Sequence, residues 1–150
     1  MPEAAPVFAF TNAAAMLAWL PLALSLFIKP MQPWTWRITG IIVPAVLAVF
    51  YVISIIGGMT NGLTGGNFSS IEGIRTLFTD DHFLTAGWIH YLAFDLFVGT
   101  WIARTGTSAG IHPLLLLPCM ALTFLAGPTG LLLYLLLRLF AGPRNWETLA

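Results

Sequence analysis

Four stretches of the chain are apolar over roughly the length that crosses a lipid bilayer. A membrane-spanning helix needs roughly 20 mostly apolar residues, and the stretches lie at about 8–28, 38–56, 85–103 and 113–140. Polar or turn-forming pairs such as Lys29-Pro30 and Gly57-Gly58 follow the first two. The pattern therefore predicts an all-α membrane protein with four transmembrane helices, in a single domain over residues 1–150.

The long connection between the second and third stretches carries a weaker helical signal. Apolar residues recur at helical spacing from Phe68 to Phe78. Ser69 and Glu72 have the spacing of a capping box. This predicts a short amphipathic helix at about 70–78, which lies on the membrane or dips into the bundle.

The fourth stretch is interrupted by Pro118 and by the pair Gly127-Pro128. A proline removes one backbone hydrogen bond and usually bends a helix, so we expect a kink or a break near Gly127. Such a break either lines a substrate cavity or is tolerated without a role, and both interpretations stay open.

Four crossings would place both termini and the long loop on one side of the membrane. The six lysines and arginines would then divide evenly between the two sides. They are Arg75, Arg138 and Arg144 on the side of the long loop, and Lys29, Arg37 and Arg104 on the other. The positive charges therefore give no orientation.

The composition agrees with a membrane location. Hydrophobic residues make up 58% of the chain and charged residues only 8%, against about 25% charged in soluble domains. The net charge is zero and no basic run occurs, which argues against a nucleic-acid partner. The single cysteine excludes an intrachain disulfide and a multi-cysteine metal site.

The third stretch contains an imidazole and a carboxylate, His90 and Asp95. Lipid is a poor solvent for both groups, so each should face protein or water. Their spacing places them about 140° apart around a helix, which disfavours a shared metal, and no metal-ligand motif occurs. Structural roles also stay open, since Asp95 could cap a broken helix, His90 could donate a hydrogen bond between helices, and Glu72 could belong only to the capping box.

We expect the polar groups to gather in the half of the bundle that faces the long loop. There, His90 and Asp95 would share a chamber roofed by Glu72. These three are the candidate catalytic residues, and no metal or cofactor is expected. The candidate substrate-binding residues are Asn12, Arg75, Trp88, Tyr91, Arg104, Thr123 and Tyr134.

Several segments resemble a known family. They are Phe68 to Gly73, the run from Ala86 to Arg104, Pro118-Cys119 to Thr123-Phe124, and Gly127-Pro128-x-Gly130-Leu131 to Tyr134, and Asn12 also fits. The chain resembles the abscisic-acid-deficient-four-like membrane proteins of plants, algae and bacteria, which are tied to neoxanthin synthesis. The resemblance covers nearly the whole chain.

The resemblance implies a membrane-embedded isomerase that acts on a carotenoid or another apolar lipid. Plant members are implicated in converting the epoxide end ring of violaxanthin to the allenic end group of neoxanthin. In such a reaction Asp95 or Glu72 would be the acid and His90 the base, with Arg75 or Arg104 orienting an oxygen. The chain shows no plant transit peptide, so we expect a bacterial inner membrane. Membrane lipid is a further expected partner, and a homo-oligomer stays open.

Two other functions stay open. The chain could be a non-catalytic carotenoid- or retinoid-binding protein, whose polar groups only anchor a ring hydroxyl. It could also be a metal-dependent membrane enzyme that uses Glu72, His90 and Asp95 as ligands. A small bundle that stabilises a larger complex, or a homo-oligomer packed through alanine-rich faces, is the structural alternative.

Overall fold

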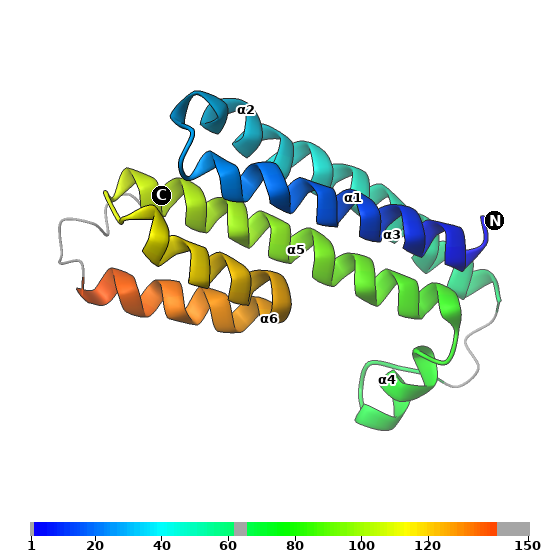
Figure 1. Ribbon diagram of the computed structural model, residues 1–150. Coiled ribbons are helices and arrows are strands. Elements are labelled where there is room, and N and C mark those ends of the chain that lie inside the picture. The colour runs from blue at the N-terminus through cyan, green and yellow to red at the C-terminus, as the bar shows by residue number, and fades with distance from the viewer. Residues whose placement is uncertain (1, 62–65, 141–150) are drawn as a thin grey trace.

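The computed structural model describes residues 2–61 and 66–140, and in that part of the chain it contains helices and no strands. Three long helices pack against one another: α1 (Ala4–Ser25), α3 (Val43–Thr60) and α5 (Asp81–Ser108) (Figure 1). Helix α5 contacts α1, α3 and α6 (Pro113–Phe140), so it is the centre of the fold. The predicted all-α class is confirmed.

The helix that leads into α3 begins earlier than expected. A short 3-10 turn, η1 (Lys29–Met31), is followed by α2 (Gln32–Arg37) and by a π-helical segment, η2 (Ile38–Ile42). Thr39 of η2 is buried, and its Oγ1 accepts a hydrogen bond of 2.8 Å from Thr100 Oγ1 of α5. This bond fixes the π-helical turn against the central helix.

The same helix continues through Gly57 and Gly58, where the sequence suggested an end. A Cβ on Gly57 would lie 2.8 Å from His82 Nδ1, and one on Gly58 would lie 2.6 Å from Phe83 Cδ2. These glycines therefore allow α3 to approach the start of α5 closely and do not terminate the helix.

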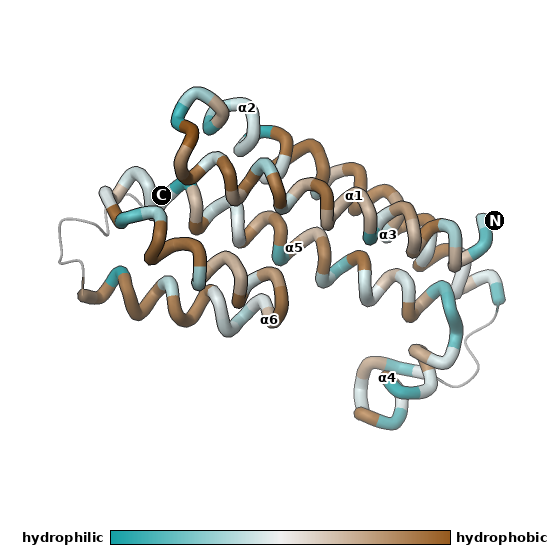
Figure 2. Tube along the Cα trace, in the orientation of Figure 1, coloured by the Kyte–Doolittle hydropathy of each residue, from teal (hydrophilic) through white to brown (hydrophobic). Residues whose placement is uncertain are grey.

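Three helical segments are long and apolar enough to cross a membrane: Ala4–Ser25, Lys29–Thr60 and Pro113–Phe140. The prediction of four such segments is wrong for α5, which has 28 residues but carries Asp95, Arg104 and several threonines. In Figure 2 the tube of α5 alternates between brown and paler or teal segments. Because α5 lies between the other helices, many of its polar groups meet protein, which removes the need for a wholly apolar surface.

Helix α6 folds back on itself. The backbone of Ala126 is non-helical, with φ −156° and ψ 63°, and Figure 1 shows one arm running out from the α5–α6 turn and the other returning beside it. A methyl group on Gly130 would overlap the backbone N of Thr123 and the backbone O of Cys119. In a straight helix residues 119 and 130 would be about 16 Å apart. The predicted break near Gly127 is confirmed, and it produces a hairpin of two arms.

The hairpin changes the expected topology. Each arm holds about half of the 28 residues, or roughly 20 Å of helix, whereas the hydrocarbon layer is about 30 Å thick. The arms enter and leave at one end of the bundle, so the end of α6 lies opposite the N-terminus (Figure 1). The expectation that both ends of the chain share a side is therefore corrected for residues 2–140. Arg144 lies outside the described residues.

This topology also gathers most of the described positive charges at one end of the bundle. Arg138 is buried near the α5–α6 turn, where its Nη1 donates to Thr105 O at 3.2 Å. It therefore joins the end of the bundle that already holds Lys29, Arg37 and Arg104, and leaves Arg75 as the one described lysine or arginine near the other end. From the positive-inside rule we therefore expect the Lys29 end to face the cytoplasmic side.

Cysteine labelling tests the hairpin and the orientation together. In a Cys119→Ala background, Ser108→Cys and Leu139→Cys should react with a membrane-impermeant maleimide from the same, cytoplasmic side. Ser69→Cys should react only from the opposite side. A straight α6 would instead give Leu139→Cys the same labelling as Ser69→Cys, which would contradict the re-entrant topology.

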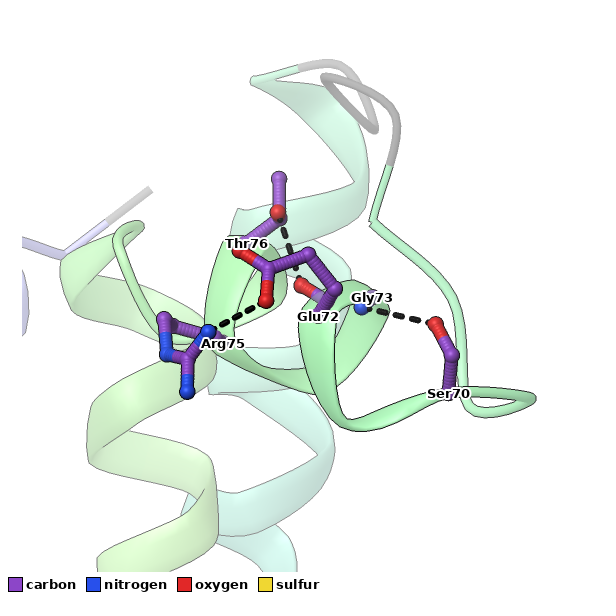
Figure 3. Close-up of polar contacts among 5 residues, drawn as sticks. All are labelled: Ser70, Glu72, Gly73, Arg75 and Thr76. Atoms are coloured by element: carbon purple, nitrogen blue, oxygen red, sulfur yellow. Dashed lines mark hydrogen bonds and ion pairs between the residues drawn. The ribbon is translucent and has the colours of Figure 1, made fainter.

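The predicted helix in the long connection is confirmed as α4 (Ile71–Leu77). Its N-cap is Ser70 and not Ser69, since Ser70 Oγ accepts a hydrogen bond of 3.0 Å from Gly73 N (Figure 3). Glu72 does not reach back to the cap. It forms an ion pair with Arg75 on the exposed side of α4 (Figure 3).

Asp80 is the N-cap of α5. Its Oδ1 accepts hydrogen bonds from His82 N and Phe83 N, at 2.9 and 3.1 Å, and its Oδ2 accepts one from Asn61 Nδ2 at 3.1 Å. Slight burial raises the pKa of Asp80, but the hydrogen bonds from Asn61, Phe83 and His82 outweigh it and hold the pKa below its ordinary value.

The lowered pKa of Asp80 predicts a pH-dependent contribution to stability. The stabilisation should be complete above the unfolded pKa, near 4, and should disappear as the pH falls through the lower folded pKa. Asp80→Ala should lower the free energy of unfolding by about 1 kcal/mol at neutral pH. Asp80→Asn should keep most of the cap and lose the pH dependence. Thermal unfolding of the three proteins between neutral pH and pH of about 3 checks this.

Candidate functional site

Asp95 lies against the tip of the α6 hairpin. Its side chain is only 8% exposed, and a methyl group on Gly127 would overlap its Oδ1. One turn earlier on α5, the Tyr91 hydroxyl donates a 3.1 Å hydrogen bond to Phe124 O, a carbonyl beside the break. Asp95 Oδ2 is buried and has no hydrogen-bond partner among the described residues. Asp95 therefore packs against the broken helix without a capping hydrogen bond in the described structure, and its role as a cap stays a prediction.

His90 lies on a different face of α5. Its exposed ring stacks on Phe94, with ring centroids 4.6 Å apart, and lies 6.1 Å from the Tyr51 ring of α3. It contributes to a pocket of about 310 Å³ between α3, α5 and the segment that carries α4, which we call the imidazole pocket. The lining residues are Tyr51, Ile55, Phe68, Leu77, Phe78, Phe83, Ala86, Gly87 and His90.

The imidazole pocket is almost wholly apolar. His90 and Tyr51 supply the only polar side chains among its lining residues. Ligand sites of this kind bury an apolar molecule and orient it by one or two polar groups. The pocket therefore suits a mainly apolar group that meets one or two polar side chains.

The expected chamber shared by His90, Asp95 and Glu72 does not form in the described part of the chain. Asp95 turns toward the hairpin tip, whereas His90 turns toward α3 and α4. The Glu72 side chain is 77% exposed and pairs with Arg75, because α4 directs its apolar residues Leu77 and Phe78 to the pocket. The three candidate acids and bases are thus divided among three places.

Several of the expected substrate-binding residues connect helices. Asn12 Oδ1 accepts a 3.1 Å hydrogen bond from Trp88 Nε1, and Trp88 stacks on Tyr91. Thr123 is buried and its Oγ1 donates to Cys119 O at 2.8 Å. The buried Tyr134 hydroxyl lies 2.6 Å from Thr105 Oγ1. The Asn12–Trp88 and Tyr134–Thr105 contacts hold α1 and the hairpin to α5, whereas the Thr123 and Trp88–Tyr91 contacts lie within single helices.

Arg104 lies far from the imidazole pocket. It is 14 residues beyond His90 on one helix, or about 21 Å along the axis. It lines a second pocket, together with Arg37. Arg104 and His90 therefore do not act on one ring in this structure. Tyr51 and Arg37 were missing from the expected site, although Arg37 follows an interfacial-type tryptophan pair in the sequence.

A metal centre is not supported by the described residues, in which no three His, Cys, Asp or Glu side chains come close enough to hold an ion. The ligand set proposed for the metal-dependent alternative, Glu72 with His90 and Asp95, is the set that the fold separates.

Comparison with known proteins gives one match. The model of the ABA DEFICIENT 4-like family matches residues 6–134, a range that includes the hairpin tip and both pockets. No curated protein and no solved structure matches the chain. The match and the three apolar segments are compatible with a membrane protein, but they do not support the expected bacterial inner membrane.

Proposed function

Because the chain belongs to the ABA DEFICIENT 4-like family, we propose that it acts inside a membrane on a carotenoid or a related isoprenoid, as an isomerase of an oxygen-bearing end ring. The family is associated with neoxanthin synthesis, which supports a carotenoid-related role. The observation that carries the proposal is the apolar pocket with His90 and Tyr51 as its polar groups.

The face of α5 around His90 suits a long apolar ligand. Phe94 and Phe97 are 58% and 51% exposed and continue in the direction of Trp101 at helical spacing. A ring in the imidazole pocket could extend its polyene along this aromatic face, where lipid would otherwise lie. Helix α5 packs beside α1 and α3, so in this proposal it lies across the membrane with them, shielded by their apolar surfaces.

The reaction needs one proton donor and one base. Opening an epoxide to an allene breaks a carbon–oxygen bond and a carbon–hydrogen bond, adds one proton to the oxygen, and leaves the atomic composition unchanged. In this proposal the imidazole of His90 removes the carbon-bound proton, and the Tyr51 hydroxyl donates a proton to the epoxide oxygen. The two rings lie 6.1 Å apart, a separation that brings both groups to one pocket. Asp95 acts in this proposal as a positioning residue for the hairpin.

Non-catalytic carotenoid binding is the second candidate. The imidazole pocket has no carboxylate among its lining residues, and a phenol and an imidazole also suffice to anchor a ring hydroxyl. This protein would then deliver an unchanged pigment.

Blocking the pocket tests both candidates. Wild-type protein, Ile55→Trp and the control Val52→Trp would be purified from a carotenoid-producing host and their pigments identified by chromatography. Ile55 lines the pocket, whereas Val52 is 52% exposed on the same helix. We expect Ile55→Trp to lose both pigment and product and Val52→Trp to keep them. Bound but unconverted pigment in the wild type would favour the carrier, and no pigment with no product would contradict both.

A further inference from the structure

A second pocket lies at the end of α5 away from α4, and we call it the arginine pocket. It has a volume of about 670 Å³ and is bounded by α2, η2 and α5. Its charged lining residues are Arg37 and Arg104, both exposed, and no acidic residue lines it. The remaining walls are mostly aromatic and aliphatic, with Trp36, Ile41, Phe97 and Trp101.

The two guanidinium groups have no described carboxylate beside them. The start of α1, α4 and the start of α5 lie toward the opposite end of the bundle (Figure 1), and they carry Glu3, Glu72, Asp80 and Asp81. Asp95 is buried against the hairpin tip. The Arg37 guanidinium lies 5.7 Å from the centre of the Trp34 ring. This cation–π contact orients the guanidinium but does not neutralise its positive charge. The pocket thus concentrates positive charge that an anion would neutralise.

Trp36 adds a hydrogen-bond donor. Its Nε1 is buried and has no hydrogen-bond partner among the described residues. Trp36 lines the arginine pocket and also a neighbouring hollow beside Lys29 and Gln32. A buried N–H without an acceptor is costly, so an acceptor atom that reaches Nε1 would be stabilised. The wall that carries Trp36 and Arg37 runs into the π-helical turn η2, which the bond between Thr39 and Thr100 holds against α5. Such turns are frequent at functional sites.

We propose that the arginine pocket binds the phosphate group of an amphiphile. Arg37 and Arg104 would bind the phosphate oxygens with charge-assisted hydrogen bonds, and Trp36 would donate a third. The apolar tail would lie on Ile41 and Phe97. The site is about 21 Å along α5 from His90 and does not depend on the isomerase proposal. The phosphate could come from a membrane phospholipid or from free phosphate, which the same two arginines would recognise.

Ligand-dependent thermal stabilisation tests the proposal. Protein in a non-ionic detergent would be titrated with phosphatidylglycerol, with a diacylglycerol of the same chains, or with inorganic phosphate. Phosphatidylglycerol should raise the Tm, and the diacylglycerol should not. Arg37→Gln and Arg104→Gln should each weaken the apparent affinity about fivefold, and Arg75→Gln, at the other end of the bundle, should leave it unchanged.

Further outcomes distinguish a phospholipid from free phosphate and decide whether the proposal stands. Equal stabilisation by inorganic phosphate and by phosphatidylglycerol would identify free phosphate as the ligand and would overturn the proposal of an amphiphile. Trp36→Phe, which keeps the packing and removes the N–H, should also weaken binding, so the test does not depend on an arginine variant that fails to fold. Equal responses to phosphatidylglycerol and diacylglycerol, or unchanged binding in both Arg37→Gln and Arg104→Gln, would overturn the proposal.

Discussion

Replacing Gly130 with alanine should lower the free energy of unfolding by about 3 kcal/mol, the upper end of the usual cost of overpacking. The added methyl group would overlap backbone atoms of Thr123 and Cys119 on the facing arm of the hairpin. Backbone atoms inside a helix cannot move away as a flexible side chain can, so the two arms must separate. The separation would also disturb the buried contact between Tyr134 and Thr105.

Thermal or denaturant unfolding in detergent, followed by tryptophan fluorescence, measures this effect. Trp101 packs edge-on against Tyr134 of the returning arm, with ring centroids 5.4 Å apart, so its emission should respond when the hairpin opens. Thr129→Ala is the matched control, because Thr129 is the exposed neighbour of Gly130. Equal stability of Gly130→Ala and Thr129→Ala would show that the arms do not approach as closely as described.

Replacing His90 with alanine should reduce carotenoid conversion by about 100-fold or more while pigment still binds. A positioned general acid or base typically contributes about 100- to 10,000-fold to a rate. The rest of the imidazole pocket is apolar and remains after this substitution. The effect should therefore fall on the chemical step and leave most of the binding energy intact.

His112→Ala provides the control, because His112 is exposed at the opposite end of the bundle and does not line the imidazole pocket. Product formed per bound pigment, measured by chromatography over time, separates conversion from binding. His90→Ala with wild-type conversion would exclude His90 as the base. Loss of pigment binding together with conversion would instead assign His90 an anchoring role and favour the carrier.

Local signals in the sequence were sufficient for the long apolar helices and for the break near Gly127, but not for the end of α3 or for the π-helical turn η2. Long apolar runs predicted the apolar helices, and the Gly127-Pro128 pair predicted the break in the last of them. The spacing around Ser69 and Glu72 predicted α4 to within one residue, although the cap proved to be Ser70. These features depend on interactions between residues that are close in the chain, and such interactions can be inferred from the sequence alone.

The candidate site depended on contacts that local spacing does not encode. Spacing showed that His90 and Asp95 point about 140° apart, but the neighbours of each face were decided by packing. Asp95 meets the hairpin tip because α6 turns back beside α5, and His90 meets Tyr51 and the pocket wall because α3 and the segment with α4 lie on its side. Arg37 and Arg104, 67 positions apart by their numbers, share a pocket for the same reason.

The sequence by itself thus determined an apolar, helical chain with a break near Gly127 and a histidine and an aspartate on one helix. Only the tertiary structure decided that the chain reverses at the break, because the reversal depends on Gly130 fitting against Cys119 and Thr123. That reversal moves Arg138 to the end that holds Lys29, Arg37 and Arg104, and it gives Asp95 its neighbour. The physical reason is that a break permits many directions, and packing between residues distant in sequence selects one.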